Sequence, residues 1–544
     1  MKFTRRDIDL GELTAILARA GSGALGGEDL EKLKAAVDTL ALLTREIEAQ
    51  GASIDRLRKL LFGARTERTE KIFPAAAAGQ SSTAAQPAAS DSPKGSDTER
   101  PKHPGHGRHG AAAYPGAQKV TLAHATVHHG DRCPGCWRGK LYTQSQPATL
   151  VRIRGMAPLQ ATVYERERLR CNLCGEVFTA AAPKGVGTEK YDASVAAMIA
   201  LLKYGCGLPF HRIEKLQRNL GIPMPAATQW GLVAGAAEPL QAAQEELIRQ
   251  AAQGEIVHND DTTMKLLEFA QPAFPEDEDT DARSGVYTSG IVARCADRQI
   301  ALFFTGRKHA GENLAEVLKK RAAALPPPIQ MCDALSHNTA GEFNTIVANC
   351  LAHARRQFVD VAPSFPEPCR YVLETLRQVY RNDARARAEQ MSPDERLAFH
   401  QEHSGPLLRG LQWWLHEQLE QRKVEPNSTL GGAVNYLLKH WRKLTLFLEQ
   451  PGAPLDNNVC ERALKKAILH RKNALFYKTE NGAAVGDRFM SLIHTAELNQ
   501  VDPFDYLVQL QRHAAALKAT PAQWMPWTYR DTLAALSTGP DPPT

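Results

Sequence analysis

The stretch PLDNNVCERALKKAILHRKNALF, residues 454–476, predicts a loop followed by a helix. Pro454 and the polar residues after Leu455 are typical of a loop. Beyond them the apolar residues recur at three- and four-residue spacing, which predicts an amphipathic helix. The expected buried face consists of Ala463, Leu464, Ala467, Ile468 and Leu475.

Glu461 falls in the first turn of this expected helix. The basic residues around it are Arg462, Lys465, Lys466, Arg471 and Lys472. A carboxylate set in a basic surface is what a site that works beside phosphates requires. The alternative is an ordinary solvated helix in which Glu461 pairs with Lys465 one turn later.

Length and composition indicate a globular chain of several domains. The 544 residues predict three or four domains, and 43% of them are hydrophobic. The net charge of +6 is spread unevenly, because residues 276–281 form an acidic loop, so a basic binding surface would be local. No apolar run is long enough to span a membrane and the first residues lack a signal-peptide core, which predicts a cytosolic protein without a membrane partner.

The N-terminal part predicts a coiled coil followed by a linker. Leu33, Leu40, Ile47, Ile54 and Leu61 recur at intervals of seven, so we expect a leucine-rich coiled-coil helix within residues 1–73 and a homo-oligomer. A helical hairpin packed within one chain would show the same pattern. Residues 74–118 are rich in Ala, Ser, Gly, Pro and Gln, which predicts a disordered linker.

Two Cys-x-x-Cys pairs predict a structural zinc site within residues 119–185. Four thiolates on two tight turns suit a closed tetrahedral site, and the β-rich segment between the pairs suits a zinc ribbon. Such a site has no open position for catalysis. The alternative is a set of unrelated core cysteines. The expected ligands are Cys133, Cys136, Cys171 and Cys174.

Residues 186–250 predict helices, two of which are joined by a short Gly-Ile-Pro turn. This spacing is typical of a DNA-binding helix-turn-helix, although ordinary helical hairpins share it. From residue 255 the hydrophobic period changes to two, which predicts strands. The expected strands lie in EIVHNDDTTMKLLEF, SGVYTSGIVARC, QIALFFTG, PIQMCDAL and TIVANCLAHARRQF, with a helix after the third.

The order of these elements is consistent with a ribonuclease-H-like α/β sheet. We expect a catalytic core over residues 251–500, with an all-α insertion at about 366–450, and a C-terminal tail over 501–544. Asp260 lies on the first strand, Asp333 ends the fourth and Glu461 lies on the later helix. Carboxylate oxygens are the ligands that magnesium prefers, so these three residues could form a two-metal site.

Several segments resemble the transposase of the insertion sequence 66 family of bacterial mobile elements. HNDDTTMKLL, CLAHARRQF and PLDNNVCERALKKAILHRKNALF, followed by SLIHTAELNQVDPFDYL, are similar to that family's core. FGARTERTEK resembles its N-terminal segment, CPGC with CNLCG its zinc-binding domain, and YDASVAAMIALLKYGCGLPFHRIEKLQ its helical region. TPAQWMPWTYRD resembles its C-terminal tail, so the resemblance covers most of the chain.

The resemblance implies a ribonuclease-H-like fold with an aspartate, aspartate and glutamate active site. Carried over by motif, these residues are Asp260, Asp333 and Glu461. The family's first motif usually reads Asp-Glu-Thr, whereas this chain has Asp-Asp-Thr, so Asp261 is an alternative first ligand that the motif register disfavours. Leu351 stands where the family usually has Trp.

The sequence therefore predicts a bacterial DNA transposase that acts in the cytoplasm, on the nucleoid when it binds DNA. We expect two magnesium ions, replaceable by manganese, and one structural zinc. The expected partners are element ends, target DNA and companion proteins of the element. Candidate phosphate contacts are His353, Arg355, Arg356, Lys465, Lys466, Arg471 and Lys472. The alternatives are a DNA-binding protein without catalysis and a stand-alone nuclease of the same fold.

Overall fold

The computed structural model describes residues 189–270, 285–341 and 343–537, with shorter stretches between residues 126 and 183 and a few single positions before residue 34. Apart from those single positions, the expected coiled coil lies outside the described residues, as does the expected linker of residues 74–118. Two compact units account for the chain. Among the described residues, the first unit comprises the single positions before residue 34, Glu255–Asp260 and Ala323–Glu461. The second comprises the residues from 126 to Gly254, Asp261–Ala322 and Arg462 onwards.

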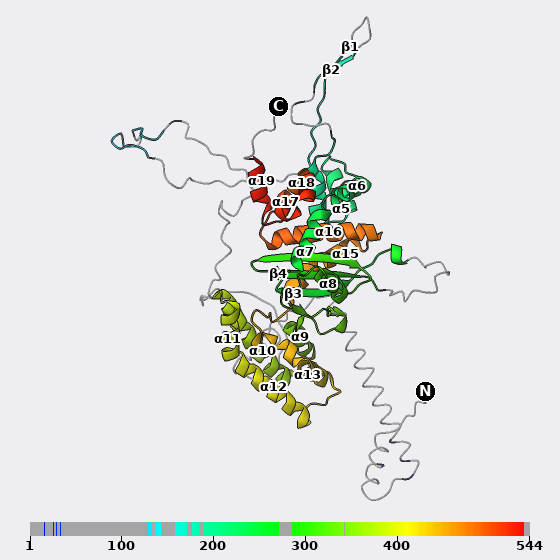
Figure 1. Ribbon diagram of the computed structural model, residues 1–544, viewed down its shortest axis with the longest axis vertical. Helices are drawn as coiled ribbons and strands as arrows, with labels where there is room; N and C mark the ends of the chain where they lie inside the picture. Colours follow the sequence, from blue (N-terminus) through cyan, green and yellow to red (C-terminus); the bar gives the residue numbers. More distant parts are fainter. Residues whose placement is uncertain are drawn as a thin grey trace, which may run out of the picture. The chain divides into compact units, whose positions relative to one another are not determined.

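A five-stranded mixed sheet has the strand order β5-β4-β3-β6-β7 (Figure 1). All five strands expected from the hydrophobic pattern are present. Strands β6 and β7 run parallel to β3, and β4 pairs with β5 in antiparallel register. The bounds are β3 Ile256–Thr263, β4 Tyr287–Cys295, β5 Arg298–Gly306, β6 Ile329–Cys332 and β7 Ile346–Asn349.

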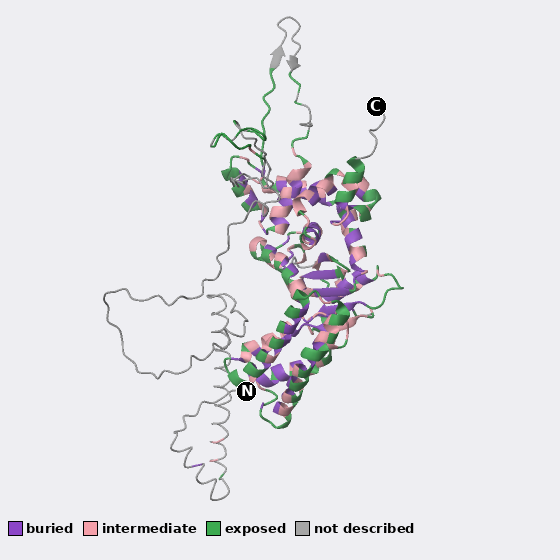
Figure 2. Cartoon of the chain, turned by 90° about the vertical axis from the view of Figure 1, so that its left-hand side faces the viewer, coloured by how far each residue is buried: buried purple, intermediate pink, exposed green. Residues whose placement is uncertain are grey.

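Strands β4, β5 and β6 of this sheet carry buried apolar runs, whereas β3 becomes polar toward its carboxyl end. All four residues of β6 are buried, and so are six consecutive residues of β4. In Figure 2 the buried colour covers much of the strands, whereas most helices carry buried residues on one side and exposed residues on the other. The protein is therefore a mixed α/β fold in which helices supply the outer layers.

The helices of the second unit come from three separate parts of the described chain. After α4 a π-helical turn, Leu201–Gly205, leads into α5, and α15 crosses from the first unit at Glu461. Their bounds are α4 Ala193–Ala200, α5 Phe210–Asn219, α6 Ala226–Ala237, α7 Gln241–Ala251, α8 Ala310–Leu318, α15 Asn458–Ala474, α16 Glu480–Leu498, α17 Pro503–Arg512, α18 Ala514–Ala519 and α19 Tyr529–Ser537.

Helix α16 covers the open edge of β5. The backbone N–H groups of Ala301 and Phe303 donate to the hydroxyl oxygens of Thr495 and Ser491, both at 3.0 Å, and that of Thr305 donates to the Asp487 carboxylate at 2.6 Å. The donors lie two residues apart on β5 and the acceptors four residues apart on α16, and both spacings span roughly 6 Å. Each donor on the strand therefore lies opposite an acceptor on the helix. The edge strand is thereby closed to pairing with another chain.

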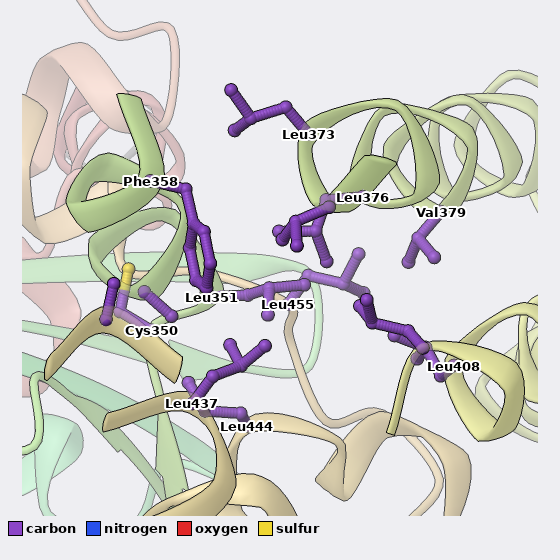
Figure 3. Packing of buried hydrophobic residues seen from close by; sticks show 14 of the residues in the cluster. Cys350, Leu351, Phe358, Leu373, Leu376, Val379, Leu408, Leu437, Leu444 and Leu455 are labelled. Atoms are coloured by element: carbon purple, nitrogen blue, oxygen red, sulfur yellow. The ribbon is translucent and has the colours of Figure 1, made fainter. Parts of the chain in front are cut away.

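The first unit packs its helices and strands around one hydrophobic core. Figure 3 shows Leu351 and Phe358 of α9 facing Leu376 of α10 and Leu437 of α13. The helices expected between residues 366 and 450 therefore share a core with β6 and β7. Their bounds are α9 Leu351–Val361, α10 Pro366–Ala388, α11 Pro393–His403, α12 Gly405–Glu420, α13 Thr429–Lys439 and α14 Trp441–Leu444.

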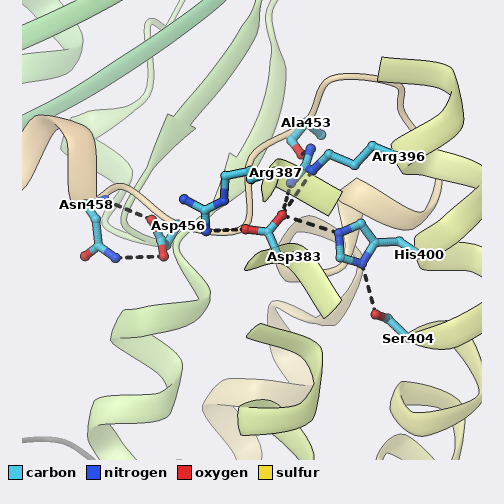
Figure 4. A network of polar contacts seen from close by, with 8 residues as sticks. All are labelled: Asp383, Arg387, Arg396, His400, Ser404, Ala453, Asp456 and Asn458. Carbon is cyan, nitrogen blue, oxygen red and sulfur yellow. Dashed lines mark hydrogen bonds and ion pairs between the residues drawn. The ribbon is translucent and has the colours of Figure 1, made fainter. Parts of the chain in front are cut away.

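A buried polar network joins two helices of this unit, α10 and α11, to the loop before α15 (Figure 4). Asp383 of α10 accepts hydrogen bonds from Arg387, from Arg396 at 2.7 Å and from His400 at 3.4 Å. Arg396 also donates to the backbone oxygen of Ala453 at 2.8 Å, just before α15. Burial acts to raise the pKa of Asp383, but His400 and the two arginines outweigh it and hold that pKa well below its usual range.

The region that was expected to form a zinc ribbon is described only in part. Strands β1 Arg168–Arg170 and β2 Val177–Thr179 form an antiparallel pair on either side of the segment that contains Cys171 and Cys174, and both cysteines lie outside the described residues. Cys133 lies outside them too. Cys136 is exposed, and its sulfur accepts a hydrogen bond from Gly139 N at 3.5 Å.

The helix expected around residues 458–475 is present as α15. Ala463, Leu464 and Ala467 are buried as predicted. The prediction is wrong at Leu475, which is 64% exposed and has φ of 70°, because the helix has already ended at Ala474. No helix that the structure describes is long and apolar enough to cross a membrane.

Candidate active site

Asp260 and Asp333 lie at neighbouring positions of parallel strands. Ile256 pairs with Ile329 and His258 with Met331, so the same register continued by two residues sets Asp260 opposite Asp333. Asp333 follows the last residue of β6 directly. Both side chains are half-buried. The carboxyl ends of these strands therefore bring together two carboxylates that are far apart in the sequence.

One amide connects the two carboxylates. The side-chain nitrogen of Asn338 lies 2.5 Å from Asp333 Oδ1 and 3.5 Å from Asp260 Oδ1, so those oxygens cannot be farther apart than the two distances combined. The backbone oxygen of Asn338 accepts hydrogen bonds from the buried amides of Asn259 and Gln330, both at 2.7 Å. Sequence analysis missed Asn338, because only the fold brings this 3₁₀ turn against β3.

The start of α15 is fixed to β3 next to Asp260. Asn457 is fully buried, and its side-chain amide donates to the backbone oxygen of Asn259 at 3.0 Å. Its side-chain oxygen lies 3.1 Å from His258 Nδ1, and its backbone N–H donates to the sulfur of Cys350 at 3.2 Å. Glu461, one turn later, donates its backbone N–H to Asn457 O.

The side chain of Glu461 faces the start of α9. His353 Nε2 lies 3.7 Å from Glu461 Oε1, and each side chain is 26% exposed. Glu461 Oε1 itself is buried and has no hydrogen-bond partner among the residues that the structure describes. The alternative interpretation paired Glu461 with Lys465. Among the ion pairs of the described residues, Glu461 pairs with His353 and not with Lys465.

Burial and these carboxylates raise the pKa values of two thiols nearby. Burial, together with the carboxylates of Asp260 and Glu461, raises the pKa of the Cys460 thiol well above its ordinary value. Burial and Asp333 raise the pKa of Cys332 to about 12, against the smaller effect of Lys443. Asp260 and Glu461 thus both act on the pKa of Cys460, and Asp333 and Asp260 both act on that of Cys332.

Asp261 is engaged elsewhere, within the second unit. Its carboxylate lies 2.9 Å from His309 Nδ1 and 3.4 Å from the backbone N–H of Ala310, at the start of α8. Side chains of successive strand residues point to opposite faces of a sheet. This geometry favours Asp260 over Asp261 as the first candidate ligand.

The candidate phosphate contacts fall into two groups. Lys465 and Lys472 are exposed on α15, whereas Lys466 pairs with Glu497 at 2.7 Å and Arg471 donates to the hydroxyls of Thr262 and Thr263. Arg355 and Arg356 are half-buried on α9. Of the four candidates on α15, Lys465 and Lys472 are thus the better placed to meet a phosphate from solution.

Comparison with known proteins connects this geometry to a family. The model of the family described as "Transposase IS66 family" matches residues 189–485, more than half of the chain. The chain is 26% identical over 539 residues to the uncharacterized protein y4jD of Sinorhizobium fredii, covering 92% of this chain and 98% of that one. It is 25% identical over 525 residues to the uncharacterized protein y4hP of the same organism, covering 90% of each. The chain belongs to the IS66 family of transposases.

Proposed function

We propose that this protein is a DNA transposase that cleaves the ends of a mobile element and joins them to target DNA. The main observation behind the proposal is that the side-chain amide of Asn338 contacts both Asp260 and Asp333. Next to them, Asn457 fixes the start of α15, the helix that contains Glu461. The five-stranded mixed sheet is consistent with a ribonuclease-H-like core.

The residues present fit a magnesium site. All three candidate ligands offer carboxylate oxygens, which magnesium prefers, and Glu461 Oε1 is a buried oxygen without a hydrogen-bond partner in the described part of the chain. Bound magnesium, or manganese in its place, would supply Lewis acidity to activate an attacking oxygen and to stabilise the leaving one. Asp260, Asp333 and Glu461 would hold the two ions, and Asn338 would set the spacing of the two aspartates.

The chain's own residues then have separate tasks. Arg355 and Arg356, with the exposed Lys465 and Lys472, bind backbone phosphates and orient the scissile bond. Hydrolysis frees a 3′-hydroxyl, which attacks the target phosphodiester at the same site. Neither step forms a covalent bond to the enzyme, so no nucleophilic side chain is required.

The other parts of the chain would serve DNA recognition and assembly. Helices α5 and α6 are the candidate helix-turn-helix, and Cys133, Cys136, Cys171 and Cys174 would hold one structural zinc. The leucine-rich segment within residues 1–73 would make the homo-oligomer that brings two element ends together. We place the reaction in the bacterial cytoplasm, on the nucleoid, with companion proteins of the element as further partners.

Strand transfer is the decisive assay. The purified protein is incubated with DNA that carries the element's own ends, a target plasmid and magnesium or manganese, with companion proteins added in a parallel reaction. We expect 3′-end cleavage and covalent joining to the plasmid. Cleavage of any DNA without joining would favour a stand-alone nuclease, and binding of the ends without cleavage would favour a non-catalytic DNA-binding protein.

Three variants assign the chemistry to residues. Glu461→Gln, Asp260→Asn and Asp333→Asn keep size and most hydrogen bonds but remove a charge that holds a cation. Each should lower cleavage and strand transfer by orders of magnitude while DNA binding persists, because ligands of a shared site act as a unit. Variants that all cleave like the unmodified protein would refute the three-carboxylate site.

A further inference from the structure

Cys350 and His353 lie together at the start of α9. Cys350 is the residue that caps the N-terminus of this helix, and His353 follows in its first turn. Glu461 approaches them from α15, at the far end of the first unit's sequence. The Cys350 sulfur, one ring nitrogen of His353 and one carboxylate oxygen of Glu461 all lie within 4.8 Å of one another.

Two of these side chains leave buried polar atoms unsatisfied. Glu461 Oε1 and His353 Nδ1 both lack a hydrogen-bond partner within the described residues. The 3.7 Å between His353 Nε2 and Glu461 Oε1 is longer than a hydrogen bond. Buried polar atoms of native proteins nearly always have a hydrogen-bond partner. Two unsatisfied atoms on side chains beside a thiol therefore indicate that a partner is missing.

We propose that Cys350, His353 and Glu461 form a second metal site, which binds a thiophilic divalent cation such as Zn²⁺ and withdraws Glu461 from the magnesium site. The Cys-x-x-His spacing places a sulfur and a nitrogen ligand on one helical turn, and the carboxylate completes three protein ligands. A fourth position remains for water or a phosphate oxygen.

The donor set selects the ion. Magnesium takes oxygen ligands almost exclusively, whereas thiolate and imidazole suit zinc. Ligand atoms around a tetrahedral zinc lie about 3.3–3.8 Å apart, given Zn–S and Zn–N distances of about 2.3 and 2.0 Å, so small inward movements of the side chains close the site. Binding releases the thiol proton of Cys350 to solvent.

The consequence for activity rests on the proposed function. Glu461 cannot serve both sites at once, so occupancy of this zinc site removes one ligand from the magnesium site. Zinc therefore acts as an inhibitor that competes for a side chain and not for DNA. Excess magnesium should relieve the inhibition, because the two ions compete for Glu461, although magnesium itself does not bind the thiolate.

Direct binding tests the site without reference to activity. The full-length protein is purified with its resident zinc, which is counted, and is then titrated with Co²⁺ while thiolate-to-metal absorption is recorded. We expect one thiolate-bound Co²⁺ beyond the resident zinc in the unmodified protein and none in Cys350→Ala. Cys369→Ala is the matched control, because Cys369 is another fully buried thiol of the same unit, and it should retain the additional ion.

Folding and a second variant keep the test decisive. Circular dichroism and thermal unfolding check that each variant is folded, and His353→Gln should also lose the additional ion with Cys350 intact. Equal binding of Co²⁺ by the unmodified protein and a folded Cys350→Ala or His353→Gln variant would overturn the proposal.

For each variant, the inhibition is measured as the ratio of end cleavage with zinc to end cleavage without zinc. End cleavage in magnesium is compared with and without micromolar zinc, and the zinc concentration for half inhibition should rise about tenfold or more in Cys350→Ala. Equal sensitivity of Cys350→Ala and Cys369→Ala would refute the inhibitory role. A protein that binds the additional ion but never cleaves DNA would refute the proposed function and leave the metal site standing.

Discussion

Asn457 donates a hydrogen bond from its side-chain amide to the backbone oxygen of Asn259, across 198 residues of sequence. The bond joins the loop before α15 to the strand residue that precedes Asp260. The same side chain contacts His258, and its backbone N–H contacts Cys350. The buried side chain of Asn457 therefore fixes the start of α15 and, with it, the position of Glu461.

Asn457→Ala tests that relationship. Removing a buried amide that makes two side-chain hydrogen bonds should lower the free energy of unfolding by roughly 1–3 kcal/mol, because its partners are left unsatisfied. End cleavage should fall by about tenfold or more, because Glu461 is no longer held in place. Urea unfolding and single-turnover cleavage measure the two effects. Asn435→Ala, which removes one exposed amide of the same unit, should change neither.

Asp261→Asn separates the adjacent aspartates. Its carboxylate contacts His309 and the first N–H group of α8, so the substitution should cost about 1 kcal/mol of stability through that helix start. Cleavage should stay close to that of the unmodified protein, whereas Asp260→Asn abolishes it. The opposite result, with Asp261→Asn inactive and Asp260→Asn active, would move the first ligand by one residue.

Exposed lysines of α15 should carry part of the DNA affinity. Replacing Lys465 and Lys472 with Ala removes two phosphate contacts, so the slope of log affinity against log salt should become shallower by about two. Fluorescence anisotropy with labelled element ends at several salt concentrations measures the slope. Lys466→Ala is the control, because Lys466 already pairs with Glu497 and its loss should leave the slope unchanged.

Asp383 should make the first unit sensitive to acid. Its arginine and histidine partners hold the pKa of Asp383 below the ordinary value in the folded state, so its contribution to stability is complete above the unfolded pKa of about 3.9. That contribution is lost as the pH falls below this value toward the folded pKa, because the unfolded state then takes up the proton first.

Asp383→Asn isolates this contribution. At pH 7 the variant should lose about 3–5 kcal/mol, because two arginines keep their charge without a buried partner. The difference from the unmodified protein should shrink as the pH is lowered from 5 to 3, which urea unfolding at each pH would measure. Asp394→Asn, a change at an exposed carboxylate of α11, should show a difference below about 1 kcal/mol at every pH. A difference that stays constant with pH would contradict the role given to Asp383.

Hydrophobic periodicity was sufficient to predict the strands. Alternating or continuous apolar runs around Val257, Ile291, Leu302 and Met331 predicted four strands, since each run must be buried on at least one face. The same reasoning predicted the helices between residues 366 and 450. It was wrong at Leu475, because apolar spacing cannot show where a backbone turns to positive φ and a helix ends.

The side-chain contacts within the candidate site could not be predicted from the sequence. Asp260 and Asp333 could be chosen by motif, but Asn338 has no signal, since an isolated asparagine in a polar turn is ordinary. Lys466 and Arg471 were grouped with Lys465 and Lys472 as phosphate contacts, and only tertiary packing shows that the first two have partners within the protein. Long-range hydrogen bonds of this kind depend on the fold and leave no local pattern.

The bond between Asn457 and Asn259 also has a consequence for the ribosome. At roughly 5–20 residues per second, the 198 residues between the two take about 10–40 s to synthesise. During that interval the nascent chain carries Asp260 and then Asp333 without Glu461. Under the proposed function, a growing chain lacks one metal ligand throughout that interval, so DNA cleavage should begin only after codon 461 has been translated.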